Sequence, residues 1–195
     1  MPDSFPITFD DQANELLAAD PLALLFGMLL DQQVPMTWAF RSPLVIKERL
    51  GDRWSPAGIA AMDPEEVVAL FCAKPAVHRY PAAMARRAHG IAVDLVEQYD
   101  GDTARLWTTA KSGAELYRRV SSLPGFATEK SQIFVALLAK RFDVKPRGWK
   151  AAAGSFADDQ PRSAADVDSL PKLREVQAWK KAQKAAKQSK SEFSM

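Results

Sequence analysis

Three dipeptides in which a helix-capping residue precedes proline divide the first third of the chain into short segments. These are Asp20-Pro21, Ser55-Pro56 and Asp63-Pro64. Asp and Ser side chains accept hydrogen bonds from the first free amides of a helix, and proline at the first helical position already has the required φ. Elsewhere apolar residues recur at three- and four-residue steps, and no run alternates with a period of two. The sequence therefore predicts an all-α protein.

The expected helices cover most of the chain. They span residues 10–19, 22–30, 37–50, 56–61, 64–72, 81–99, about 113–121, 128–142 and 171 to about 187. The segment 22–30 is apolar on nearly all sides, which predicts a helix that runs through the core. We expect one helical domain over residues 1–150, followed by a polar linker and a basic C-terminal helix or tail over 151–195.

The cysteine content, the N-terminal residues and the longest apolar stretch indicate where this protein is expected to reside. Cys72 is the single cysteine, which excludes an internal disulfide and any cluster held by four cysteines; its apolar neighbours predict that it is buried. The N-terminus lacks the positive region of a signal peptide. The longest apolar stretch, residues 21–30, is shorter than the roughly 20 residues that cross a bilayer. We expect a cytoplasmic, nucleoid-associated protein with no membrane contact.

The net charge of +2 hides an asymmetry along the chain. Residues 1–40 contain six acids and no Lys or Arg, whereas residues 74–149 contain thirteen bases and seven acids. Residues 172–195 contain seven bases and two acids. Basic segments favour a polyanionic partner, although a run of charge is also typical of a solvated face.

The segment Leu123-Pro124-Gly125-Phe126-Ala127 predicts a hairpin between two helices. Proline fixes φ and glycine permits a positive φ, so a tight turn fits here. The following helix would begin near Thr128 with free amides, which together with the helix dipole bind an anion such as a phosphate. Lys130 lies one turn into that helix. The alternative is an ordinary turn between helices.

Four stretches together resemble the helix-hairpin-helix-GPD superfamily of base-excision DNA glycosylases, which includes endonuclease III. They are Leu29-Leu30-Asp31-Gln32-Gln33, the Ser55-Pro56 to Glu65 region, the long helix ending at Asp100-Gly101, and the hairpin 123–127. The resemblance covers roughly residues 20–142. It implies a two-lobed helical fold with a DNA-facing groove between the lobes.

The resemblance also implies roles for particular residues. Gln33 would fill the gap that an extruded base leaves in the duplex, with Gln32 beside it. The residues implied to grip the DNA backbone are Leu123, Pro124, Gly125, Phe126, Ala127, Thr128 and Lys130. The alternative for the glutamine pair is that it caps the end of the preceding helix.

The chemistry that the resemblance implies is incomplete in this chain. Glu129 stands where bifunctional members have a nucleophilic lysine, so lyase activity is not expected. Arg147 stands at the position of the family's aspartate, and the nearest acid is Asp143, which is our candidate catalytic residue. The iron–sulfur cysteines are absent, and His78 and His89 stand alone, so we expect neither a cluster nor another metal or cofactor.

Three functions remain open at this point. The first is a monofunctional DNA glycosylase-like protein that acts on damaged or mismatched bases in duplex DNA, for which a monomer suffices and no protein partner is implied. The second is a catalytically inactive DNA-binding module on the same scaffold. The third is a helical protein–protein adaptor whose basic surfaces are incidental. Whether the chain is an enzyme is left open.

Overall fold

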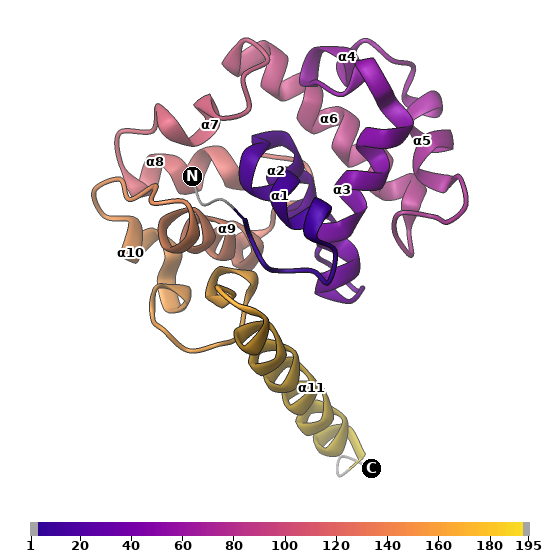
Figure 1. Cartoon of the computed structure of the whole chain (residues 1–195). Coiled ribbons are helices and arrows are strands. Elements are labelled where there is room, and N and C mark those ends of the chain that lie inside the picture. Colours follow the sequence, from indigo (N-terminus) through magenta and orange to yellow (C-terminus); the bar gives the residue numbers. More distant parts are fainter. Residues whose placement is uncertain (1–3, 193–195) are drawn as a thin grey trace.

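The computed structural model describes residues 4–192, and the side chains up to residue 186. The described part contains helices and no strand, as the sequence predicts (Figure 1). The elements in chain order are α1 Asp11–Ala19, α2 Pro21–Leu30, α3 Met36–Leu50, η1 Gly51–Arg53, α4 Pro56–Ala60, α5 Pro64–Cys72, α6 Pro81–Tyr99, α7 Arg105–Thr108, α8 Gly113–Ser121, α9 Thr128–Arg141, α10 Trp149–Ala153, η2 Gly154–Ala157, η3 Ala164–Asp166 and α11 Leu170–Glu192. The helices predicted before residue 142 are all present, with bounds shifted by one residue at most.

The predicted cap-then-proline starts are confirmed. The Asp20 carboxylate accepts from the amides of Leu22 and Ala23, the Ser55 hydroxyl from Gly58, and the Asp63 carboxylate from Glu65. Such caps satisfy amides that have no partner inside the helix.

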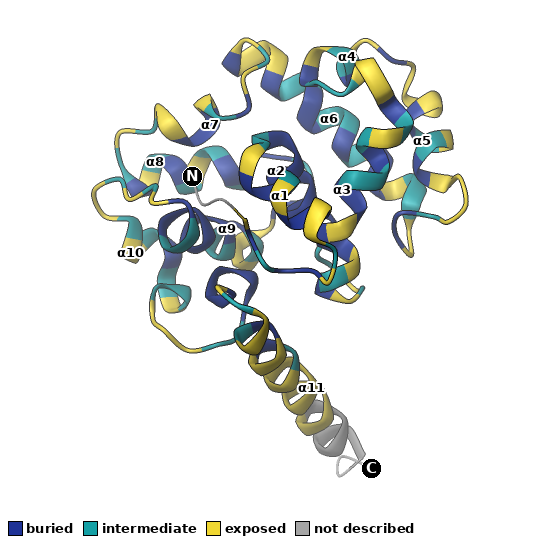
Figure 2. Cartoon of the chain, in the orientation of Figure 1, coloured by how far each residue is buried: buried dark blue, intermediate teal, exposed yellow. Residues whose placement is uncertain are grey.

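Helix α2 is the centre of the core, and residues 22–30 are all buried (Figure 2). It lies so close to α3 that a Cβ on Gly27 would come 2.7 Å from Cδ1 of Phe40. The sequence therefore needs glycine here to let the two helices pack.

The helices form two groups that share one continuous apolar core. In the first group α2 packs on α3, and α6 packs on α4 and α5. In the second, α9 packs on α8, α10 and η3 (Figure 1). Phe5, from the N-terminal segment, packs edge-on against Phe40 and Phe142, with ring centroids 6.0 and 5.7 Å apart, and so bridges the groups.

Part of the stretch 151–169, which its composition predicts to be a polar linker, is packed: residues 163–167 are buried, whereas 158–160 are exposed. Ser163, Ala164, Ala165 and Val167 are buried, and Asp166 is 8% exposed. The Asp166 carboxylate accepts from the amide and hydroxyl of Ser163 and pairs with Lys140 at 2.7 Å. These polar residues are buried because they satisfy one another, which a hydropathy pattern does not reveal.

The prediction that Cys72 is buried is wrong. Val67 and Phe71 face the core, whereas Cys72, the last residue of α5, lies on the other side of that helix and is exposed. An apolar neighbourhood in sequence does not determine the face of a helix end.

No single described helix is long and apolar enough to cross a membrane. The pair α1 and α2 passes that test only when taken together, across a bend of 115°.

Candidate nucleic-acid interface

The hairpin predicted from Leu123 to Ala127 connects α8 to α9. Leu123 and Phe126 are each 4% exposed, and the Phe126 amide donates to the Leu123 carbonyl at 3.1 Å, which closes the turn. Gly125 has φ +85°, and a Cβ there would come 2.9 Å from Cδ1 of Leu29. Leu123 and Phe126 therefore anchor the hairpin from inside, while Gly125 allows it to approach the end of α2.

The N-terminus of α9 is open. Its N-cap residue, Ala127, offers no side-chain acceptor, and Thr128 is the first helical residue rather than the cap. Thr128 and Glu129 are exposed. The first-turn amides have no intrahelical partner, so this helix end has the donors and the dipole that an anion requires.

In the turn after α2, the Gln32 side chain is bonded to the protein interior and the Gln33 side chain is exposed. The Gln32 side chain donates to the Leu29 carbonyl at 3.2 Å and accepts from Arg87 at 3.2 Å, so it is engaged internally. Gln33 is exposed and has φ +56°, a left-handed conformation that costs a non-glycine residue about 1–3 kcal/mol. Strain of this kind persists only where the neighbouring structure imposes it.

His78 is the residue that holds this turn from behind. Its ring is 1% exposed, its Nδ1 accepts from the Tyr80 amide at 3.0 Å, and its Nε2 lies 3.0 Å from the Gln32 carbonyl. Because Nδ1 accepts, Nε2 carries the proton and donates to Gln32. Burial is the main cause that lowers the pKa of His78, so the ring is neutral at pH 7. Sequence reasoning did not predict this role for a lone histidine.

Lys130 points toward the end of α2. Its Nζ donates to the Leu29 carbonyl at 2.7 Å. Burial lowers the pKa of Lys130 to about 8, with Asp31 opposing that shift and Arg87 adding to it. The ammonium is therefore partly desolvated, and it sits at the junction of the hairpin helix and the Gln32–Gln33 turn.

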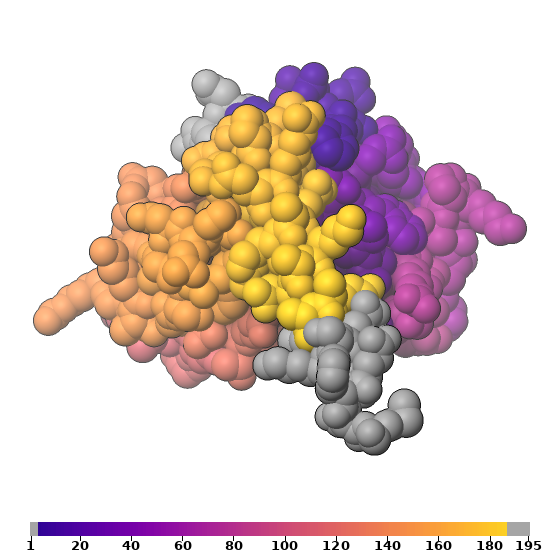
Figure 3. All heavy atoms as spheres, turned by 90° about the horizontal axis from the view of Figure 1, so that it is seen from below, coloured from indigo at the N-terminus to yellow at the C-terminus, as the bar shows by residue number. Residues whose placement is uncertain are grey.

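These two features line one groove, a cavity of about 780 Å³. Its walls come from the end of α2 and the following turn, the start of α9, the segment 156–162, and α11. The lining residues are Met28, Asp31, Gln32, Gln33, Val34, Ala127, Glu129, Lys130, Ile133, Phe156, Arg162, Trp179, Lys180, Gln183 and Lys184. Figure 3 shows α11, in yellow, crossing the lower face of the molecule between the orange and purple segments.

Asp143 does not reach this groove. It follows the far end of α9, which has 14 residues and is therefore about 20 Å long. Its side chain is 87% exposed and pairs with Lys145 at 2.6 Å, and this contact lowers the pKa of Asp143. The acids that line the groove are Asp31 and Glu129. Two sequence signals pointed to this groove: Asp31 directly precedes the glutamine pair, and the segment that forms α11 is basic. Phe156 and Arg162 carried no signal.

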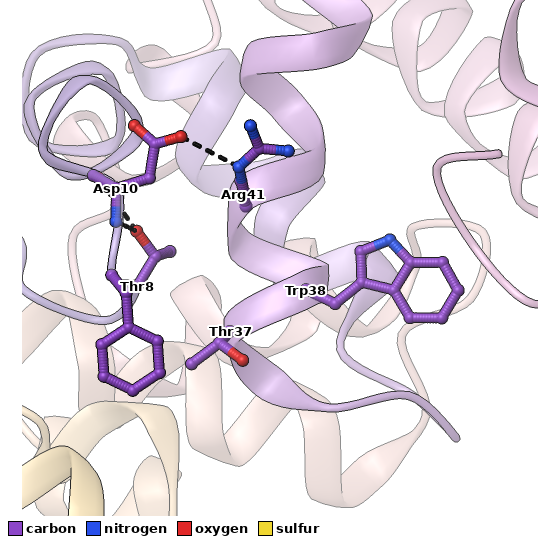
Figure 4. A pocket seen from close by; sticks show the side chains of 6 residues that line it. Thr8, Asp10, Thr37, Trp38 and Arg41 are labelled. Carbon is purple, nitrogen blue, oxygen red and sulfur yellow. Dashed lines mark hydrogen bonds and ion pairs between the residues drawn. The ribbon is translucent and has the colours of Figure 1, made fainter. Parts of the chain in front are cut away.

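A second, smaller cavity lies near the N-terminus. It measures about 370 Å³ and is lined by Thr8, Phe9, Asp10, Thr37, Trp38 and Arg41. Asp10 and Arg41, its two charged residues, pair with each other at 2.9 Å, and the Trp38 indole points away from them (Figure 4). Since these charges neutralise each other, the groove at α9 is the stronger candidate site.

Among the side chains that the structure describes, residues 4–186, no group of three or more His, Cys, Asp or Glu is placed to hold a metal ion. No family model matches the chain, and neither the curated proteins nor the solved structures yield a match.

Proposed function

We propose that this chain binds duplex DNA across the groove and acts as a monofunctional DNA glycosylase-like protein on damaged or mismatched bases. One observation carries the proposal. The open N-terminus of α9 and the strained Gln33 turn, which are 94 or more residues apart in sequence, line the same cavity. The likeness to the helix-hairpin-helix-GPD fold, with its two lobes and central groove, is part of this proposal.

The hairpin supplies what a backbone phosphate needs. Three first-turn amides at Thr128, Glu129 and Lys130 point out of α9 without a cap. Gly125 lets the chain approach closely, and the Lys130 ammonium lies within the same groove. A helix N-terminus with a nearby cation is a favourable phosphate site.

The turn at Gln33 supplies a group that can enter a base stack. Its exposed amide both donates and accepts, as base edges require. The Tyr80 ring is 45% exposed and lies next to His78, with centroids 6.2 Å apart. An exposed aromatic ring is thus adjacent to the histidine that holds the turn, and aromatic rings stack on unpaired bases.

The groove has room for an extruded nucleoside, because small-molecule sites typically measure about 300–1,000 Å³. In the proposed reaction, water replaces the base at C1′ as the N-glycosidic bond breaks, and positive charge develops on the sugar. A carboxylate stabilises that charge, and we assign this role to Asp31 in place of Asp143. The Asp31 side chain is 11% exposed, and it lines the cavity beside Lys130.

The inactive DNA-binding module is the second candidate, and the position of Asp143 favours it. The acid nearest in sequence to the family's aspartate is exposed and paired with a lysine outside the groove. A module of this kind would bind duplexes in a salt-sensitive manner and release no base.

Excision on a panel of labelled duplexes separates these functions. The duplexes carry alkylated, oxidised, deaminated or mismatched bases, and alkali reveals abasic sites. We expect product from the parent and from Asp143→Asn, and none from Asp31→Asn. Glu129→Gln is run beside them, because Glu129 is the other acid that lines the groove. Salt-sensitive binding with no product on any duplex would identify the binding module. No binding at any salt concentration would reject both and leave the helical adaptor.

A further inference from the structure

Helix α11 is attached at its base, and its middle part lines the groove. Leu173 and Val176 are fully buried, and the helix contacts η3. Trp179, Lys180, Gln183 and Lys184 line the cavity opposite α9. These four residues form one wall of the groove, while the helix as a whole projects from the body (Figure 1).

One face of α11 changes character along its length. Leu173, Val176, Lys180 and Lys184 follow each other at steps of three and four residues, so they share a face. That face is apolar where it packs on the body and cationic where it reaches the groove. A lysine that serves only solubility is expected to point away from the body. The neighbouring Lys181 fits that description because it does not line the groove, whereas Lys180 and Lys184 do.

Lys180 already has an acidic partner in the opposite wall. Its Nζ lies 3.7 Å from Oδ2 of Asp31, with the Lys180 side chain 41% exposed. This distance is long for an ion pair, and a partly exposed pair of this kind contributes roughly 0–1 kcal/mol. The contact is therefore weak enough for a stronger anion to replace it.

The charges around the cavity favour an anionic occupant. Four cationic side chains line it, from Lys130, Arg162, Lys180 and Lys184, against the two carboxylates of Asp31 and Glu129. Arg162 is also paired with Asp158 outside the lining, so the cations exceed the acids by one. Trp179, which is 39% exposed, adds an aromatic surface beside the lysines. A phosphate backbone next to bases complements these features, because its negative charges pair with the cations and its bases stack on the aromatic ring.

We propose that α11 is a phosphate-contacting arm, in which Lys180 and Lys184 bind the backbone of the DNA duplex and Lys180 exchanges Asp31 for a phosphate. The inference rests on the proposed function, because it needs DNA in the groove. It adds a second contact surface, on the side of the groove opposite the hairpin.

Single lysine variants of the full chain test the arm, with an unmodified 20-base-pair duplex as the probe. Each phosphate contact adds about 0.9 to the steepness with which log K falls as log salt rises, so a tenfold rise in salt costs roughly eightfold in affinity per contact. We expect Lys180→Gln and Lys184→Gln each to lower the slope by about 0.9. The matched control is Lys181→Gln, which removes the same charge one residue away and should leave the slope unchanged.

The outcomes separate the arm from the proposed function. If all three variants lower the slope equally, α11 acts as a diffuse positive charge and the arm is rejected. If the parent binds with a salt slope and none of the variants changes it, the arm is also rejected while duplex binding stands. A parent that shows no salt-dependent binding overturns the proposed function, and the arm with it.

A double-mutant cycle tests the exchange of partners. Asp31→Asn should tighten binding in the parent background, because Lys180 is released. The gain should disappear in the Lys180→Gln background, since it depends on that lysine. An equal gain in both backgrounds would mean that Asp31 only repels DNA, and would overturn the exchange.

Discussion

The Nζ atom of Lys130 donates a 2.7 Å hydrogen bond to the carbonyl oxygen of Leu29, which joins the hairpin helix to the last turn of α2 across 101 residues of chain. The same carbonyl accepts from the Gln32 side chain at 3.2 Å. The position of the hairpin relative to the Gln32–Gln33 turn therefore depends on one partly desolvated ammonium group.

Lys130→Met should change how stability depends on alkaline pH. Burial lowers the pKa of Lys130 from 10.5 to about 8, so between these values the unfolded chain binds a proton that the folded chain lacks. The stability of the parent should then rise relative to the variant from pH 8 to pH 10.5, by at most about 1.4 kcal/mol per pH unit. Urea unfolding at pH 7, 8, 9 and 10 measures this difference. A constant difference across the series would contradict it, and the exposed Lys150→Met is the control.

Acidification should loosen the Gln33 turn through His78. Burial lowers the pKa of this ring, so its neutral form stabilises the fold above pH 6.5, and that stability is lost as the pH falls through the folded pKa. Protonation would also direct an N–H at the Tyr80 amide, which already donates to Nδ1. The melting temperature of the parent should drop between pH 7 and pH 5, and His78→Gln should be less stable with a flatter profile. Parallel profiles for the two proteins would exclude His78 as the cause.

Gly125→Ala should destabilise the protein more than Gly101→Ala. Both glycines have positive φ, so each alanine costs about 1 kcal/mol in backbone strain. At Gly125 the added Cβ would also lie 2.9 Å from Leu29 and 3.0 Å from Arg87, whereas nothing lies within 4 Å of a Cβ on Gly101. We expect about 1 kcal/mol of additional loss for Gly125→Ala. Chemical denaturation compares the two, and weaker duplex binding should accompany the Gly125 variant alone; equal effects would show that the hairpin tolerates the methyl group.

Lys140→Met should be strongly destabilising, by about 3–5 kcal/mol. Lys140 and Asp166 form a buried pair at 2.7 Å, with side chains 9% and 4% exposed, and the variant leaves Asp166 as an uncompensated buried charge. The matched control is Lys145→Met, which breaks the exposed pair with Asp143 and should cost far less, because solvent screens an exposed pair. Urea midpoints distinguish them. Similar losses would mean that segment 158–167 does not depend on this pair.

Sequence reasoning located the helices because their signals are local. Asp20 caps two amides of its own helix, and residues 22–30 are apolar around the whole helix, so both features act within a few residues of chain. The hairpin at Leu123 to Ala127 was predictable for the same reason, since proline and glycine restrict the backbone where they stand. That the Gln32 side chain is engaged internally was not predictable, because Arg87 and His78 hold that turn from distant parts of the chain.

What the sequence alone determined is the all-α class, the bounds of the longer helices before residue 142 and the tight hairpin, because capping, helical periodicity and turn chemistry act over neighbouring residues. The tertiary structure alone decided that Asp31 rather than Asp143 lines the groove, that Lys130 loses solvent, and that the polar residues Ser163 and Asp166 are buried. Each of these depends on contacts between residues far apart in the chain, where burial and pairing are set by how helices pack. Local pattern carries no information about those distances.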